Sequence, residues 1–271
     1  MGSTTSPDVG IESARNQLEL ISLLPVIYGN GLATCFPCPP DLLTEIIHIN
    51  HLRSRFRGIA AAALDADEPL LGEYKHSTAL DVLRRIRAFS ADNWAAGVAF
   101  GISKSVTGES AVDAPASFSD WQAVACIFQL AVAIYCIASL LHDTVETGAC
   151  RGNSYGPNIN ANNTDPHLNP QEVLAKARKT CRSILLGRLR EVSKCTQLRK
   201  MVLWPLVVAG IEAEDEATKR FVLDELRWIS NALGTASPLV ARDFLEKRVW
   251  GLELRRRSWD ALFDQSYVFV L

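Results

Sequence analysis

The sequence predicts an all-α protein, a single large helical domain packed around one buried helix near the middle of the chain. Two observations support this prediction. The stretch from Trp121 to Leu141 has no charged side chain, and apolar residues occupy every face of it, so a helix here must be buried all round. Elsewhere apolar residues recur at helical spacing, and no segment shows the period-two alternation of a half-buried strand.

The central helix is expected at about residues 119–145, and it begins at Ser119 and Asp120, which form a helix start signal. At about 20 residues the apolar run is also long enough to cross a bilayer. Its flanks favour the protein interior, because His142 and Asp143 follow it and no excess of Lys or Arg marks either side. We therefore expect no membrane association.

The composition indicates an ordinary globular protein of a reducing compartment. Hydrophobic residues make up 48% of the chain and charged residues 21%, which is enough for a sizeable core. The formal net charge is −2, so the chain as a whole has no attraction to nucleic acid. Seven cysteines, an odd number, and an N-terminus without a secretion signal favour the nucleus or the cytoplasm.

The N-terminal half is divided into helices by turn residues and caps. Residues 60–75 stay unassigned, because Ala-rich, acidic and Pro/Gly-containing pieces follow one another there. The expected elements are a disordered tail at 1–10, a helix at 11–28, a second from Pro40, a third capped by Ser77, and a short fourth after Ser90 with a loose stretch from Gly101 to Ser117.

The C-terminal half begins with a long flexible loop at 148–169, rich in Asn, Gly and Pro. Pro170 restarts a helix of about six turns with a basic outer face, and the residues predicted to face inward are Val173, Leu174, Ala177, Cys181, Ile184, Leu185 and Leu189. Pro205 lies inside an apolar helical run and should kink or break it near Trp204. Two more helices are expected to start at 214–216 and at 237–238, and the apolar tail after the last one should dock on the body.

No metal, cofactor or catalytic site is predicted. Cys35 and Cys38 form a CxxC pair, and His48 and His51 would complete a C-x2-C-x9-H-x2-H set, but these spacings do not match a zinc finger and no βαβ setting supports thiol exchange. The sequence has no nucleophile elbow, phosphate-binding loop or dinucleotide fingerprint. The acidic cluster around Glu212 is explained by helix capping.

Several blocks of the chain resemble a known family. MVLWPLVVAGIEA, FVLDEL, LGTASPLVARDFLEKRVW and WDALFDQSYVFV, together with CPPDLLTEIIHINHLR, LDVLRRIRAFS and FQLAVAIYCIASL, are similar to the fungal-specific transcription factor domain. This is the C-terminal regulatory region of fungal zinc-cluster transcription factors, here of the acriflavine-sensitivity-control type. The resemblance covers the chain from about residue 18 onward. It implies an all-helical domain for regulation, partner contacts and small-molecule sensing.

The resemblance brings no catalytic residue to this chain. We interpret the positions that match it as packing and capping residues, namely Asn50, Arg53, Trp204, Pro205, Gly210, Glu212 and Trp250. Arg53 and Glu212 are in addition hypothesised to pair with each other in the core.

The chain departs from the family pattern in its cysteines. A zinc cluster needs six cysteines, with C-x2-C-x6-C occurring twice, and only Cys35-x2-Cys38 is present, so we expect no direct DNA binding. Three interpretations stay open: a truncated gene product, a stand-alone regulator that works through partners, or a helical fold turned to another use.

The first functional hypothesis is a transcription-regulator-like, non-enzymatic protein of a filamentous fungus, acting by protein contacts or ligand sensing within a secondary-metabolite gene set. The alternative is an enzyme or small-ligand-binding protein of a biosynthetic pathway on the same scaffold, with a pocket lined by Trp94, Tyr135, His142 and Trp204. A third option, a homo- or heterodimerisation module, predicts an exposed apolar stripe on the first or last helix.

Overall fold

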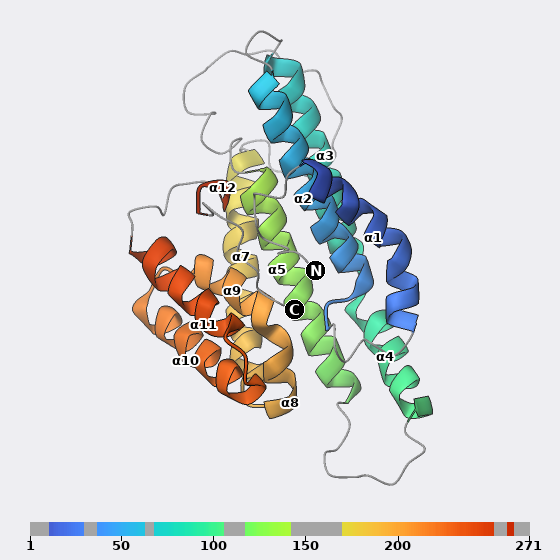
Figure 1. Cartoon of the computed structure of the whole chain (residues 1–271), viewed down its shortest axis with the longest axis vertical. Coiled ribbons are helices and arrows are strands. Elements are labelled where there is room, and N and C mark those ends of the chain that lie inside the picture. The colour runs from blue at the N-terminus through green and yellow to red at the C-terminus, as the bar shows by residue number, and fades with distance from the viewer. Residues whose placement is uncertain are drawn as a thin grey trace.

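The computed structural model describes residues 11–29, 37–62, 68–105, 117–141, 170–251 and 259–262. All regular secondary structure in these ranges is helical, which confirms the predicted all-α class (Figure 1). The predictions for the tail at 1–10 and the loop at 148–169 concern residues outside these ranges.

The helices form two groups on either side of α5, which runs through the middle of the molecule (Figure 1). α5 contacts α2, α3 and α4 in one group and α7 and α9 in the other. The elements are α1 (Ile11–Gly29), α2 (Pro40–Ala62), α3 (Glu68–Ala88), α4 (Ala91–Ser105), α5 (Phe118–Leu140), α7 (Pro170–Val192), α8 (Thr196–Arg199), a 3-10 turn (Lys200–Val202), α9 (Leu203–Ile211), α10 (Glu216–Leu233), α11 (Ser237–Phe244), a π-helical turn (Leu245–Trp250) and α12 (Trp259–Leu262).

The central helix starts at Phe118, one residue before the predicted Ser119. Ser117 is its N-cap, and a capping box joins it to Asp120: the Asp120 amide donates to Ser117 Oγ at 3.2 Å and the Ser117 amide donates to Asp120 Oδ2 at 2.7 Å. α5 is long and apolar enough to cross a membrane, but 72% of its apolar window is buried inside the protein. This burial is the one expected of a core helix.

Two predicted boundaries in the N-terminal half are wrong. Ser77 does not cap a helix, because α3 begins at Glu68, and Pro69 occupies its first turn, where a missing N–H costs nothing. The stretch from Gly101 is not all loose, since α4 extends to Ser105. The predicted cap at Ser90 is confirmed, because the Asn93 amide donates to Ser90 Oγ at 3.2 Å.

The predicted break near Trp204 is confirmed, and it lies at the start of α9. The 3-10 turn Lys200–Val202 ends just before α9, so Pro205 is the third residue of the new helix. The first four N–H groups of a helix have no partner within it, and Pro205 therefore removes no hydrogen bond. The proline is placed where the helix tolerates it.

The turn Leu245–Trp250 is held against α9 at Gly210. The indole N–H of Trp250 donates to the Gly210 carbonyl at 3.0 Å. A Cβ at position 210 would lie 2.5 Å from Leu245 Cδ1 and 3.1 Å from Val222 Cγ1. Glycine is therefore required here because α9, α10 and the π-helical turn approach one another closely.

Gly210→Ala is expected to lower the free energy of unfolding by about 1–3 kcal/mol, the usual cost of overpacking a core. Leu245 and Val222 are fully buried, so they can give way only by shifting against other core side chains. Gly97→Ala on α4 is the matched control, since nothing lies within 4 Å of its added Cβ; it should be neutral or stabilising by about 0.5–1 kcal/mol. Urea denaturation measures both, and equal effects would contradict the close approach.

Buried carboxylates tie neighbouring helices together through two-pronged ion pairs with arginine. Arg85 of α3 donates to Glu45 of α2 at 2.7 and 2.9 Å. Two similar pairs join Arg178 to Glu212 and Arg199 to Glu225. Each glutamate is buried, so each pair fixes the position of one helix on the next.

The ion pair of Glu45 with Arg85 makes the stability of the fold depend on pH in the acidic range. Burial alone would raise the pKa of Glu45, but hydrogen bonds from His48 and Arg85 outweigh burial and hold the pKa below its ordinary 4.5. The stabilisation is therefore present above pH 4.5 and is lost as pH falls through the lower pKa of the folded state. We expect the difference in unfolding free energy between the native chain and Glu45→Gln to shrink as pH falls below that value. A constant difference would contradict this.

Candidate functional site

The centre of the molecule holds a buried aromatic cluster. Tyr135 of α5 and Trp204 of α9 have no exposed surface, and their rings meet edge to face at 6.0 Å. Phe128, also of α5, stacks on Trp204 at 6.3 Å, and Trp259 of α12 lies 5.0 Å from Tyr135. The burial of Trp259 confirms that part of the C-terminal tail docks on the body.

A polar network connects this cluster to α2. The Tyr135 hydroxyl donates to Asn50 Oδ1 at 2.5 Å and accepts a hydrogen bond from the Arg53 guanidinium. The guanidinium carbon of Arg53 also lies 5.4 Å from the centre of the Tyr135 ring. All three side chains are buried, so this network belongs to the core.

The hypothesised pair between Arg53 and Glu212 is wrong. The Glu212 carboxylate accepts two hydrogen bonds from Arg178 of α7, at 2.5 and 2.9 Å. Arg182, one turn further along α7, donates to the Glu212 carbonyl at 3.3 Å. Glu212 therefore closes the junction after α9 onto α7, while Arg53 serves the α2–α5 contact.

The structure describes three of the four residues of the predicted pocket, and two of these three are in contact. Tyr135 and Trp204 are in contact, as described, but Trp94 packs on Trp121 at 5.9 Å. Trp121 and Tyr135 are about 21 Å apart along the axis of α5 at 1.5 Å per residue. His142 lies outside the described residues, so the pocket lined by all four stays a prediction.

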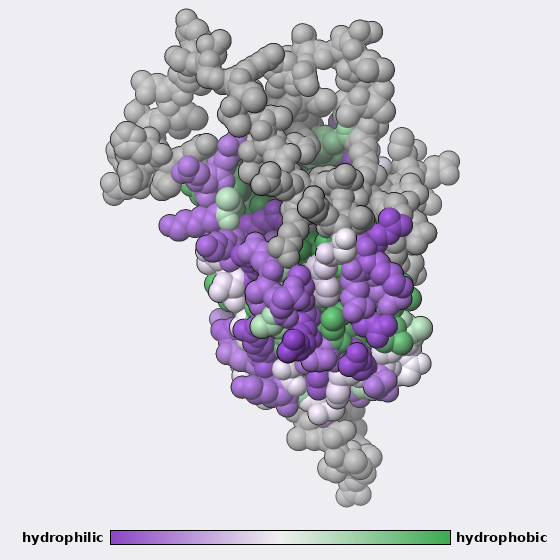
Figure 2. Space-filling model, turned by 90° about the vertical axis from the view of Figure 1, so that its left-hand side faces the viewer, coloured by the Kyte–Doolittle hydropathy of each residue, from purple (hydrophilic) through white to green (hydrophobic). Residues whose placement is uncertain are grey.

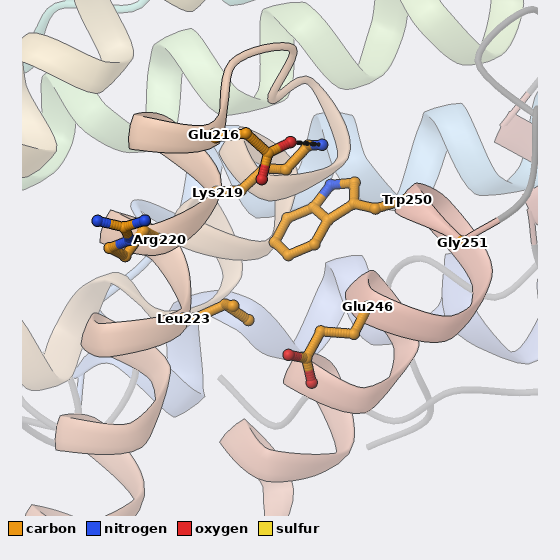
Figure 3. A pocket seen from close by; sticks show the side chains of 7 residues that line it. All are labelled: Glu216, Lys219, Arg220, Leu223, Glu246, Trp250 and Gly251. Atoms are coloured by element: carbon orange, nitrogen blue, oxygen red, sulfur yellow. Dashed lines mark hydrogen bonds and ion pairs between the residues drawn. The ribbon is translucent and has the colours of Figure 1, made fainter.

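A surface pocket lies elsewhere, between α10 and the π-helical turn (Figure 3). Its volume is about 310 Å³. The indole ring of Trp250 projects between the two elements, fixed by its bond to Gly210. Lys219 lies 5.7 Å from the centre of this ring and pairs with Glu216. The lining residues are Glu216, Lys219, Arg220, Leu223, Glu246, Trp250 and Gly251.

The pocket combines one aromatic face with charges of both signs and is open to solvent. Glu216 is 81% exposed and Glu246 44%, whereas the side chain of Lys219 is only 11% exposed because it packs along the indole. Such a site suits reversible binding of a small polar group better than acid–base chemistry, which relies on desolvated groups. Sequence reasoning noted Trp250 but missed the pocket, since its walls are about 30 residues apart in the chain.

The cysteines and histidines weighed above as zinc ligands have separate structural surroundings where the structure describes them. Cys35 lies outside the described part, and Cys38 is fully buried, which raises the pKa of its thiol well above its ordinary value and keeps it protonated. His48 contacts Glu45 at 3.3 Å, and burial lowers the pKa of His51. Within the described ranges, no group of three or more His, Cys, Asp or Glu side chains is arranged to hold a metal ion.

The side of the molecule formed by α10 and α11 is mostly hydrophilic (Figure 2). It therefore offers few large apolar areas to a partner. On α1, Leu23 and Val26 are 50% and 63% exposed, and they lie three residues apart on one face. On α11, Val240 is 45% exposed. Dimerisation through the first or last helix stays a prediction.

The family model and the curated relative that match this chain both describe transcription regulators. Residues 1–267 match the family model described as a fungal specific transcription factor domain. The chain is 29% identical over 236 residues to a phomenoic acid biosynthesis cluster-specific transcriptional regulator of Leptosphaeria maculans. The aligned region covers 86% of this chain but 36% of that relative, so the chain spans about a third of the length of the curated relative. No solved structure matches the chain.

The family match extends over nearly the whole chain and agrees with the all-helical fold and with the resemblance seen in the sequence blocks. The protein therefore belongs to the family of the fungal-specific transcription factor domain, and it is transcription-regulator-like.

Proposed function

We propose that this chain controls the transcription of a secondary-metabolite gene set from the nucleus, through contacts with other proteins and with a DNA-binding partner. The observation that carries the proposal is the family match over residues 1–267, together with a relative that is a cluster-specific regulator. The regulated genes are those of one biosynthetic pathway, near the gene for this protein.

The fold supports a binding function. Buried glutamates locked to arginines join α2 to α3, α7 to the end of α9, and α8 to α10. These pairs fix the positions of neighbouring helices on one another, as a protein-recognition surface requires. The charged side chains that are buried in the described core serve these joints and the network of Tyr135, and they are Glu45, Arg53, Glu212 and Glu225.

A second candidate function is small-ligand binding at the Trp250 pocket, either to sense a pathway metabolite or to serve the pathway directly. Its volume of about 310 Å³ is at the lower end of the range for ligand sites. The indole face and the adjacent Lys219 and Glu246 would select a small molecule with both an aromatic or apolar part and a polar group.

Deletion of the gene tests the first function against the second. The transcripts of the chromosomal neighbours and the small molecules in the same cultures are measured together. A fall of these transcripts supports the regulator. Steady transcripts with loss of a metabolite and accumulation of its precursor would overturn it and favour an enzyme.

A Trp250→Ala strain then tests the pocket, with the protein level checked by immunoblot. If the pocket senses a ligand, the transcripts change although the protein accumulates normally. If they match those of the unmodified strain, ligand sensing at this pocket is contradicted.

A further inference from the structure

Positive charge is concentrated in one segment of an otherwise slightly acidic chain. Residues 170–200, which run from the start of α7 through α8 to Lys200 of the 3-10 turn, contain nine Lys and Arg but two Asp and Glu. The whole chain has 28 Lys and Arg against 30 Asp and Glu. This segment therefore creates a local positive field that the net charge of the protein conceals.

The arginines and lysines of the segment have different roles. Four arginines are engaged with acidic side chains, in the pairs Arg178–Glu212, Arg182–Glu214, Arg188–Glu191 and Arg199–Glu225. The remaining cations are all exposed and make no ion pair within the described ranges: Lys176, Lys179, Arg190, Lys194 and Lys200. The guanidinium of Arg190 lies 5.6 Å from the centre of the Phe221 ring. The fold therefore leaves this charge available to a partner.

Large apolar side chains are exposed beside these cations. Val173 and Ile184 are 48% and 47% exposed, although both were expected to face inward. They are 11 residues apart, or about three turns, so they lie on the same side of α7. Lys176 lies beside them on the helix surface. Around the helix axis its position differs from theirs by about 60–80°, at 100° per residue.

Gly187 is exposed on this outer face of α7, and no contact within the described fold explains why the residue is a glycine. Nothing lies within 4 Å of a Cβ added there, so no close contact demands glycine. Glycine inside a helix lowers stability relative to alanine. Its effect here is to leave the backbone open between Ile184 and Arg190, where another chain can approach.

We propose that the outer face of α7, defined by Lys176, Lys179, Arg190, Val173, Ile184 and Gly187, docks an acidic amphipathic segment of a protein partner. This rests on the proposed function, because the partner is a component of the same regulatory assembly. The acidic side chains pair with the free cations, and the apolar ones cover Val173 and Ile184. A nucleic acid backbone would use the cations but would leave the two apolar side chains exposed.

Binding is tested with the purified full chain and three probes. The first is a fluorescein-labelled synthetic peptide of about 20 residues, long enough to follow α7, with Asp/Glu and Leu/Phe at helical spacing. The second peptide has the same acidic residues with Ala in place of Leu and Phe, and the third probe is duplex DNA of similar length. Fluorescence anisotropy should show tight, salt-sensitive binding of the first peptide alone.

Charge and apolar contacts are then removed separately. Lys176→Glu with Lys179→Glu should weaken binding of the first peptide about tenfold or more, and Ile184→Ser several-fold. The control Arg84→Glu with Lys247→Glu changes the net charge equally at exposed positions of α3 and the π-helical turn, and it should bind as the native chain does. Equal loss in the control, or equal binding of the alanine peptide or the DNA, would overturn the proposal.

Gly187→Leu separates docking from folding. The melting temperature should be unchanged or higher, because leucine favours a helix and has free space here, while binding of the first peptide is lost. Native binding by this variant would show that the partner does not lie along this face.

The same charge variants in the fungus separate this inference from the proposed function. If deletion of the gene leaves the neighbouring transcripts steady, the proposed function fails. If deletion lowers them but Lys176→Glu with Lys179→Glu does not, at equal protein level, the regulator stands and the docking face fails.

Discussion

Trp204→Ala is expected to lower the free energy of unfolding by about 3–5 kcal/mol, the range for deletion of a large aromatic side chain from a core. Trp204 has no exposed surface, and it packs α9 onto the central helix by contacting Phe128 and Tyr135 of α5. Its loss leaves a cavity that rigid helices on both sides cannot close.

Trp228→Ala is the matched control for this variant. Trp228 is half-buried on α10, and its principal ring contact is with the guanidinium of Arg199 at 4.0 Å. Its removal should cost about 1–2 kcal/mol, because solvent can enter the space. Chemical denaturation followed by circular dichroism measures both. A loss at Trp204 no larger than that at Trp228 would show that α9 is not a central joint of the fold.

The central helix was predictable because its evidence is local. Between Trp121 and Leu141 no face is polar, and this pattern has one solution in a folded protein, burial on all sides. Helix starts were predicted well where the cap and its partner are adjacent, as at Ser90. They failed at Ser77, where a serine with cap-like neighbours lies inside α3, which begins nine residues earlier at Glu68.

The candidate sites were not predictable in the same way, since their parts are distant in the chain. The Tyr135 hydroxyl bonds to a side chain 85 residues earlier, and Trp250 bonds to a carbonyl 40 residues earlier. Sequence spacing carries no information about such pairs. The sequence did indicate that Arg53 and Glu212 have specific roles, but each is paired with a partner that only the packing of α2 on α5 and of α7 on α9 determines.

On α7, periodicity assigned two apolar residues to the wrong side of the helix. Periodicity placed Val173 and Ile184 on the inward face because both are large and apolar, and the structure places both outside. A stripe of apolar side chains about 100° wide covers the core-facing side of a helix. Residues at its margin can be assigned to either side, and the position of the neighbouring helices decides between them.

The pair of Arg178 and Glu212 should give a double-mutant cycle with strong coupling. The side chain of Arg178 is 31% exposed and that of Glu212 5%. Arg178→Met therefore leaves a buried carboxylate without its partner and should cost about 3–5 kcal/mol. Glu212→Leu leaves a guanidinium that can turn toward water, and it should cost less, about 1–2 kcal/mol.

The double variant Arg178→Met with Glu212→Leu should be more stable than Arg178→Met alone, because it buries no unpaired charge. The expected coupling energy is about 1.5–3 kcal/mol. The control cycle combines Arg53→Met with Glu212→Leu, and these two changes should add to within about 0.5 kcal/mol, since the residues share no partner. Strong coupling in the control cycle, or additivity in the first, would mean that Glu212 closes the core onto α2 and not onto α7.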